Sequence, residues 1–159
     1  MLIQPIQVSP WQSNCYLVSP HEDTAECIIV DPGITSAEPV LAAVAERGLH
    51  PVALIATHGH LDHVGDAHLL AAHWSIPLYL AKADQHLLVR PGDGLGPQGG
   101  QLMRQLTGSD TLPPVADVRD LEDPITLARI QVTPFPAPGH TSGSTLLEFT
   151  SARTSVVFT

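Results

Sequence analysis

The chain has 159 residues, of which 43% are hydrophobic and 14% are charged. This composition excludes a disordered chain and allows one domain of ordinary size with a sizeable core. Seven Lys plus Arg stand against sixteen Asp plus Glu, giving a formal net charge of −9 at pH 7, so we expect no nucleic-acid partner.

The N-terminal residues 1–5 carry no positively charged region and lead into no long apolar stretch, so they are unlike a secretory signal. Nowhere does the sequence approach the roughly 18 apolar residues of a membrane span. We therefore expect no membrane partner and a cytoplasmic location by default. The sequence leaves the oligomeric state open.

Three strands are predicted at the start of the chain. Residues 2–8 alternate apolar and polar side chains as a half-buried strand does, and residues 14–18 and 26–30 are apolar strands. The two cysteines, Cys15 and Cys27, lie in the second and third strands without CxxC spacing. We interpret them as small core residues of a reduced protein; a disulfide or a cysteine metal site is the less favoured alternative.

A helix and a buried strand are predicted next. The helix begins at Ser36, presents an apolar face at helical spacing and ends at Gly48. Residues 51–56 form a short apolar run that is typical of a buried strand. Apolar residues then recur at helical spacing as far as Trp74, which predicts a second helix.

Between this strand and this helix lies the heptapeptide Thr-His-Gly-His-Leu-Asp-His, residues 57–63, with four potential metal ligands. In extended backbone His58 and His60 project to the same side. The adjacent Asp62 and His63 point differently unless the chain turns into a helix there, which suggests two neighbouring metal positions. Imidazole and carboxylate ligands suit zinc, manganese or iron. The alternative, Asp62 as a helix cap among solvated histidines, is disfavoured by the strand–loop–helix context.

The middle of the chain offers weaker signals. A short strand is predicted at 77–80 and one or two helical turns at 82–89. Residues 91–100 hold five glycines and two prolines, so we expect a mobile loop or an insertion there.

Four strands are predicted in the last third of the chain, in two pairs. They are Ile125–Leu127 and Ile130–Phe135 around a tight turn at 128–129, and Thr145–Phe149 and Ser155–Phe158 around the polar link 150–153. A mixed set of strands flanked by helices indicates a layered α/β fold.

A further histidine, His140, follows three alternating prolines and Gly139. The prolines stiffen the approach, and the glycine lets the backbone turn sharply beside a metal. Together with the heptapeptide, His140 supplies a distant third histidine, and three histidines with one open position is how hydrolytic zinc sites are built.

Five segments resemble one known family. They are NCYLV (14–18), IIVDPG (28–33), THGHLDH (57–63), PGDGLGPQ (91–98) and PGHTSGS (138–144). Together they resemble the metallo-β-lactamase-fold hydrolases, and within them the glyoxalase II (hydroxyacylglutathione hydrolase) branch and its bacterial relatives. The resemblance implies an αββα sandwich.

The resemblance also implies a ligand set. It assigns His58, His60 and His140 to a first metal and Asp62 and His63 to a second. For the intact protein the implied cofactor is two zinc ions, with iron or manganese as alternatives. Asp62 is the implied catalytic residue, since it would help to hold the second metal and would orient or accept a proton from the nucleophile.

The implied activity is hydrolysis of small-molecule thioesters, such as S-lactoylglutathione, by a metal-bound hydroxide. A leaving thiolate, whose conjugate acid has a pKa near ~8.5, scarcely needs a general acid. One alternative is a mononuclear-iron persulfide dioxygenase, which resembles glyoxalase II. Another is an inactive metal-binding fragment.

The end of the chain bears on that last alternative. Residues 156–159 are strand-like, and the Gly-Asp pair and final histidine that follow in the resembled family are missing. We therefore expect residues 1–159 to be a single incomplete domain, the N-terminal two-thirds of the sandwich. As given, it should bind at most one metal tightly and hydrolyse thioesters poorly.

Other polar residues are expected to play supporting parts. Asp31 should hydrogen-bond its turn and the nearby loop rather than bind a metal. Thr57, Thr141 and Ser142 should support the ligands rather than act as nucleophiles, because no base is evident for them. The remaining histidines should lie at the surface or the edge of the core: His21, His50, His68, His73 and His86.

Overall fold

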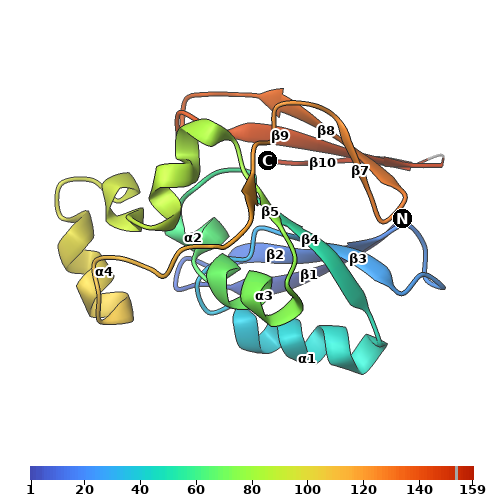
Figure 1. Ribbon diagram of the computed structural model, residues 1–159, viewed down its shortest axis with the longest axis horizontal. Coiled ribbons are helices and arrows are strands. Elements are labelled where there is room, and N and C mark those ends of the chain that lie inside the picture. Colours follow the sequence, from blue (N-terminus) through green and yellow to red (C-terminus); the bar gives the residue numbers. More distant parts are fainter. Residues whose placement is uncertain (153) are drawn as a thin grey trace.

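Two β-sheets stack face to face, and helices cover the outer side of one of them (Figure 1). The computed structural model describes residues 1–152 and 154–159. Within these residues the first sheet has the order β1 (Leu2–Val8), β2 (Ser13–Ser19), β3 (Glu26–Val30), β4 (His50–Ile55), β5 (Leu78–Tyr79) and β6 (Val118–Arg119). Its first three strands are antiparallel and its last three pairings are parallel.

The second sheet is antiparallel throughout. Its order is β10 (Thr154–Phe158), β9 (Thr145–Ser151), β8 (Ile130–Pro136) and β7 (Ile125–Leu127). The predicted turn at 128–129 is confirmed, because Ala128 and Arg129 both have positive φ, as the type I′ turn of a two-residue hairpin requires. The predicted link 150–153 is shorter than expected, since β9 continues to Ser151; Arg153 lies outside the described residues.

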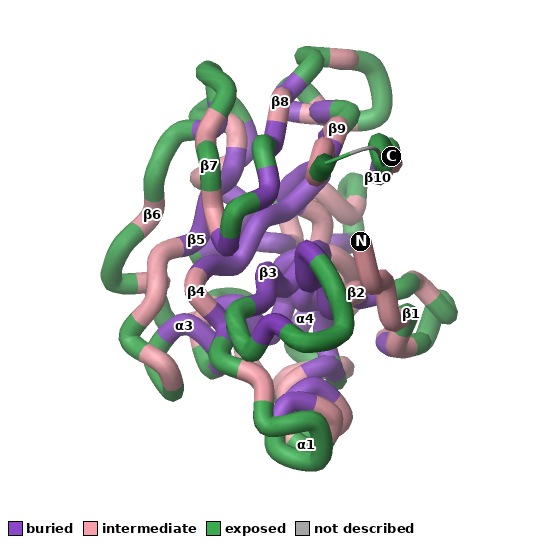
Figure 2. The backbone as a smooth tube through the Cα atoms, turned by 90° about the vertical axis from the view of Figure 1, so that its right-hand side faces the viewer, coloured by how far each residue is buried: buried purple, intermediate pink, exposed green. Residues whose placement is uncertain are grey.

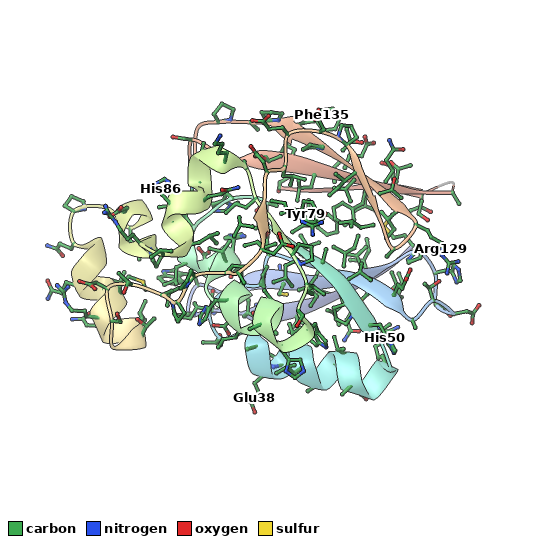
Figure 3. All side chains as sticks on the ribbon, viewed as in Figure 1. Glu38, His50, Tyr79, His86, Arg129 and Phe135 are labelled. Atoms are coloured by element: carbon green, nitrogen blue, oxygen red, sulfur yellow. The ribbon has the colours of Figure 1, made fainter. Side chains whose placement is uncertain are left out.

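Alternation along the central strands builds one core on each side of the first sheet. On β3, Ile28 and Val30 pack against the second sheet, whereas Ile29 packs toward the helices. Buried backbone accordingly gathers on the central strands, and exposed backbone on the peripheral turns (Figure 2). Tyr79 of β5 lies in the space between the two sheets (Figure 3). The layered α/β sandwich expected from the sequence is therefore confirmed.

Six helical segments connect the strands in the described residues: α1 (Ala37–Arg47), α2 (Leu61–Val64), α3 (Ala67–Trp74), the 3₁₀ segments η1 (Lys82–Leu88) and η2 (Pro91–Gly94), and α4 (Gly99–Thr107). The helix predicted between Ser36 and Gly48 is confirmed as α1, and Gly48 ends it with a left-handed φ of 60°. None of the described helices combines the length and apolar character needed to cross a membrane.

Two sequence-based expectations were wrong in detail. The single helix expected up to Trp74 is divided into α2 and α3, because the backbone N–H of Asp66 donates to the carbonyl of Pro32 (3.1 Å) and the carbonyl of Asp62 accepts the hydroxyl of Ser13 (2.9 Å) instead. Residues 91–94 form η2 and α4 begins at Gly99, so only residues 95–98 of the expected loop lack helical structure; the alternative of an insertion stays a prediction. The side chain of Met103 is fully buried against Ile34 and anchors α4.

The two cysteines are as expected. Cys15 and Cys27 are both fully buried and free. Burial raises the pKa of each thiol, so both are neutral core residues.

Candidate metal centre

The first histidine loop begins where β4 ends. The backbone N–H of Thr57 donates to Oδ1 of Asp31 (2.7 Å), and this bond fixes the chain as it leaves the sheet. His60 keeps extended backbone (φ −69°, ψ 152°) before α2 turns the chain at Leu61. The local structure therefore follows the expected sequence of extended loop and helical turn.

The second loop comes from the other sheet. Residues 137–144 join β8 to β9, and the backbone N–H of Ala137 donates to the carbonyl of Ser144 (2.8 Å) to close the loop. The two loops meet where the N–H of Thr145 donates to the carbonyl of Thr57 (2.9 Å). Each sheet thus contributes one histidine-bearing loop to the same place.

Three of the predicted ligands converge there. One ring nitrogen from each of His58, His60 and His140 lies within 4.8 Å of the others. Nδ1 of His60 and Nε2 of His140 are 2.9 Å apart. Two nitrogen ligands of a tetrahedral zinc ion are separated by about 3.4 Å, given bonds of about 2.0–2.1 Å. Small ring movements would bring the three nitrogens to one ion.

The state of His58 fits a metal ligand. Its side chain is buried, and among the described residues its Nε2 has no hydrogen-bond partner, whereas its Nδ1 lies 3.1 Å from Oγ1 of Thr57. Leaving a buried polar atom unpaired costs about 1–3 kcal/mol, which a metal bond would remove. Burial lowers the pKa of His58 to about 3, and the charges of the neighbouring histidines add to this effect. The ring is therefore neutral at pH 7, the form that binds metals.

The other two rings complete the donor set. Burial also lowers the pKa of His60, with a further contribution from the charge of His140. His60 is half-buried and His140 is exposed, so the cluster is closed on the His58 side and open to solvent on the other. An open side leaves room for a water molecule or a substrate.

Asp62 and His63 lie beside this cluster but are held differently. Nδ1 of His63 is 2.9 Å from Oδ2 of Asp31, and its Nε2 is 3.4 Å from Oδ2 of Asp62. Burial opposes protonation of His63, but its hydrogen bonds to the two carboxylates outweigh this effect and raise its pKa to about 9. Burial also disfavours ionisation of Asp62, but His63 outweighs it and holds the pKa of Asp62 below 3.8. The assignment of this pair to a second metal stays a prediction.

Asp31, Thr57 and Thr141 make supporting hydrogen bonds as the sequence indicated, and the role of Ser142 stays a prediction. Asp31 bonds the loop backbone at Thr57 and in addition holds His63. The hydroxyl of Thr141 is used in hydrogen bonds to Asp84 and Ser144. The other histidines lie outside the cluster, and Figure 3 shows His50 at the start of β4 and His86 on η1.

Two residues near the cluster carried no signal in the sequence. Asp84, on η1, is fully buried and bonds both histidine loops. Gly94, on η2, lies so close to His60 that a Cβ there would be 2.6 Å from Cδ2 of the ring. Both contacts depend on tertiary structure, so no local pattern announces them.

Comparison with known proteins identifies the sequence family. The sequence profile of the Metallo-beta-lactamase superfamily matches residues 8–159. An uncharacterized protein of Mycobacterium leprae is 32% identical over 161 residues, which cover 100% of this chain and 72% of the relative. The hydroxyacylglutathione hydrolase GloC of Haemophilus influenzae is 38% identical over 79 residues, but these cover only 50% of this chain and 36% of that enzyme.

Solved structures agree in fold. The B3 metallo-beta-lactamase BLEG-1 is similar with a TM-score of 0.75 and 28% identity, over 93% of this chain and 67% of the other. A second protein, solved in a di-iron-bound form, has a TM-score of 0.68 and 31% identity, over 93% of this chain and 66% of its own. The histidine cluster within such a fold indicates divalent-metal binding without selecting the metal.

Proposed function

The chain belongs to the metallo-beta-lactamase superfamily, and from this premise we propose that it is a metal-dependent hydrolase of small-molecule thioesters, with an acylated thiol such as an S-acylglutathione as substrate. Partial similarity to hydroxyacylglutathione hydrolases supports the thioester class. The observation that carries the proposal is the neutral, buried ring of His58, whose Nε2 has no hydrogen-bond partner within residues 1–152 and 154–159, beside two more imidazoles.

A divalent ion held by His58, His60 and His140 would supply a Lewis acid and a water whose pKa falls from 15.7 toward about 7. The chain's own groups bind and orient. The exposed position of His140 leaves one side of the cluster open for the substrate carbonyl. Thr57 and Asp31 hold the His58 ring from behind, through the Thr57 hydroxyl.

Asp62 is the group that we propose to receive a proton. Its low pKa keeps the carboxylate ionised at pH 7, and His63 fixes one of its oxygens. A carboxylate so held can accept a hydrogen bond from an attacking water. No general acid is needed for the leaving group, because a thiolate with a conjugate-acid pKa near ~8.5 is stable enough to depart unprotonated.

The test is a substrate panel on the metal-free chain reloaded with Zn²⁺, Mn²⁺ or Fe²⁺. We expect slow thiol release from S-lactoylglutathione, at a rate that falls at least tenfold in His140→Ala. Hydrolysis of a β-lactam with no thioester turnover would contradict the proposal. Oxygen uptake with glutathione persulfide in the iron form, again without thioester turnover, would contradict it in favour of a dioxygenase.

A further inference from the structure

A fully buried carboxylate lies between the two histidine loops without belonging to the ligand set. Asp84, on η1, is 1% exposed. We propose that Asp84 is a positioning residue that fixes the loop of His58 and His60 relative to the loop of His140, and so sets the separation of the three imidazoles. This inference rests on the metal site of the proposed function and not on its thioester substrate.

The hydrogen bonds of Asp84 reach both loops. Its Oδ2 accepts the backbone N–H of Gly59 (2.9 Å), the residue between the two histidines of the first loop. The same oxygen accepts the hydroxyl of Thr141 (2.6 Å), and Oδ1 accepts the N–H of Gly143 (2.7 Å). Hydrogen bonds to an ionised acceptor are roughly twice as strong as neutral ones. One carboxylate therefore joins segments that come from different sheets.

Two glycines make this close approach feasible. A Cβ on Gly59 would lie 2.8 Å from the backbone oxygen of Asp84, and a Cβ on Gly143 would lie 2.6 Å from its Cγ. Real Cβ atoms do not tolerate such distances, so any larger residue at either position would push the loop away from the carboxylate. The glycine at the centre of the His58–His60 pair is thus explained by Asp84.

The residue itself is held firmly. The N–H of Asp84 donates to the carbonyl of Ala81 (3.0 Å), and Leu87 and Leu88 of the same segment are buried. The N–H of Lys82, at the start of η1, donates to Oδ1 of Asp120 (2.9 Å). A residue that positions metal ligands must itself have a fixed position, and η1 gives Asp84 such a position.

The substitution Asp84→Asn separates the hydrogen-bonding role of Asp84 from its role in filling space. The side chain of asparagine has nearly the same volume as that of aspartate, but it has one acceptor oxygen and an NH₂ group in place of two acceptor oxygens. Three donors point at the carboxylate, so in Asp84→Asn at least one of them faces another donor. The variant should loosen one loop while it leaves the surrounding core filled.

The experiment measures Zn²⁺ affinity of the full metal-free chain by competition with a chromophoric chelator, and the visible spectrum of the Co²⁺-loaded protein. We expect Asp84→Asn to bind Zn²⁺ roughly 10- to 100-fold more weakly, as for other residues that orient metal ligands, and to shift the Co²⁺ bands. Asp66→Asn is the matched control, since Asp66 is also buried and also accepts a backbone N–H, but at α1. It should bind Zn²⁺ within twofold of wild type.

The contrary results are equally definite. If Asp84→Asn lowers the melting temperature of the metal-free protein but leaves Zn²⁺ affinity within twofold and the Co²⁺ spectrum unchanged, Asp84 is merely structural and the inference is wrong. If Asp84→Asn does not fold, Thr141→Val tests the inference in its place, because of the three donors to Asp84 it removes only the hydroxyl of Thr141. We expect at least threefold weaker Zn²⁺ binding, and unchanged binding overturns the inference.

A third variant separates this inference from the proposed function. If His140→Ala binds Zn²⁺ as tightly as wild type, the three-histidine site itself is wrong. If His140→Ala binds weakly and Asp84→Asn binds normally, the metal site stands and only the positioning role fails.

Discussion

At the scale of single residues, the chemistry of the site depends on imidazoles that stay neutral. A histidine that is buried beside other histidines resists protonation, and this is the condition His58 meets. A histidine between two carboxylates gains a proton instead, as His63 does. Histidines of one heptapeptide thus differ in pKa by several units because their neighbours differ.

The contact between Gly94 and His60 gives a first prediction. In Gly94→Ala the added Cβ would lie 2.6 Å from Cδ2 and 3.1 Å from Nε2 of the His60 ring, so the ring must move. We expect Zn²⁺ affinity to fall several-fold, with little change in the melting temperature of the metal-free protein. Chelator competition measures the former. Gly100→Ala is the control, because its Cβ would meet only the flexible end of Arg104 at 3.9 Å. Equal Zn²⁺ affinities in the two variants would contradict the prediction that the contact between Gly94 and His60 holds the ring in place.

The buried carboxylate of Asp66 gives a second prediction, on pH. Burial raises its pKa above 3.8, although backbone N–H groups at 35–37 and the charge of His68 act in the opposite direction. Because the folded-state pKa is the higher one, the contribution of Asp66 to stability is fully present below pH 3.8 and is lost as the pH rises through the folded-state pKa. The difference in melting temperature, wild type minus Asp66→Asn, should therefore decrease between acidic pH and pH 7 in the metal-free protein. If this difference in melting temperature instead grew with pH, the pKa of Asp66 would be lowered by folding, contrary to the prediction.

At the scale of secondary-structure elements, the residue that marks the start of α1 in the sequence is not the residue that caps the helix. Ser36 stands in the capping position, yet its hydroxyl makes no capping hydrogen bond and is buried without a partner among the described residues. The N–H of Ala37 is satisfied by Asp66 instead. The serine thus marks the helix start correctly while a distant carboxylate performs the capping.

This arrangement predicts an unusual result for Ser36→Ala. Loss of a working N-cap typically costs about 1 kcal/mol, but here the change removes only an unpaired buried hydroxyl. We expect the free energy of unfolding, measured by denaturant titration, to change by less than about 0.5 kcal/mol. Gly48→Ala, at a φ of 60°, is the comparison and should lose about 1–2 kcal/mol. A loss from Ser36→Ala as large as that from Gly48→Ala would show that the serine does cap.

Elements with strong local patterns were predictable, and those defined by tertiary contacts were not. The bounds of α1 follow from Ser36 and Gly48, and the β7–β8 hairpin from two strand-like segments separated by only two residues. By contrast, β6 has only two residues, and α4 begins with Gly99, a residue that normally favours a loop. The α4 helix exists because Met103 finds a buried position against Ile34.

The same division holds within the site. The spacing of His58 and His60 predicted their common direction, and the resemblance placed His140 with them. The role of Asp84 could not be predicted, because its hydrogen-bond partners lie 25, 57 and 59 positions away in the sequence. An acidic residue in a short helical segment gives no sign that two loops will fold around it.

At the scale of the whole molecule, the cluster lies where two sheets meet. The loop after β4 belongs to the first sheet and the β8–β9 loop to the second, and a backbone hydrogen bond from Thr145 to Thr57 joins them. An ion bound by histidines of both loops would link the two halves of the sandwich. Metal binding and folding should therefore be coupled.

This coupling gives a prediction for thermal unfolding. At a free Zn²⁺ concentration about 100 times the dissociation constant, binding to the folded state alone adds about 2.7 kcal/mol. For a chain of this size we expect the melting temperature to rise by roughly 5–10 °C and to return on addition of a chelator. His140→Ala should show a much smaller rise. An equal rise in this variant would place the stabilising ion elsewhere.

The central claim is that three histidines from two sheets bind one divalent ion, and anomalous X-ray diffraction from crystals grown with Zn²⁺ tests it most directly. We predict one strong peak about 2.0–2.1 Å from Nε2 of His58, Nδ1 of His60 and Nε2 of His140. A zinc ion bound elsewhere, with these three nitrogens still uncoordinated, would contradict the account.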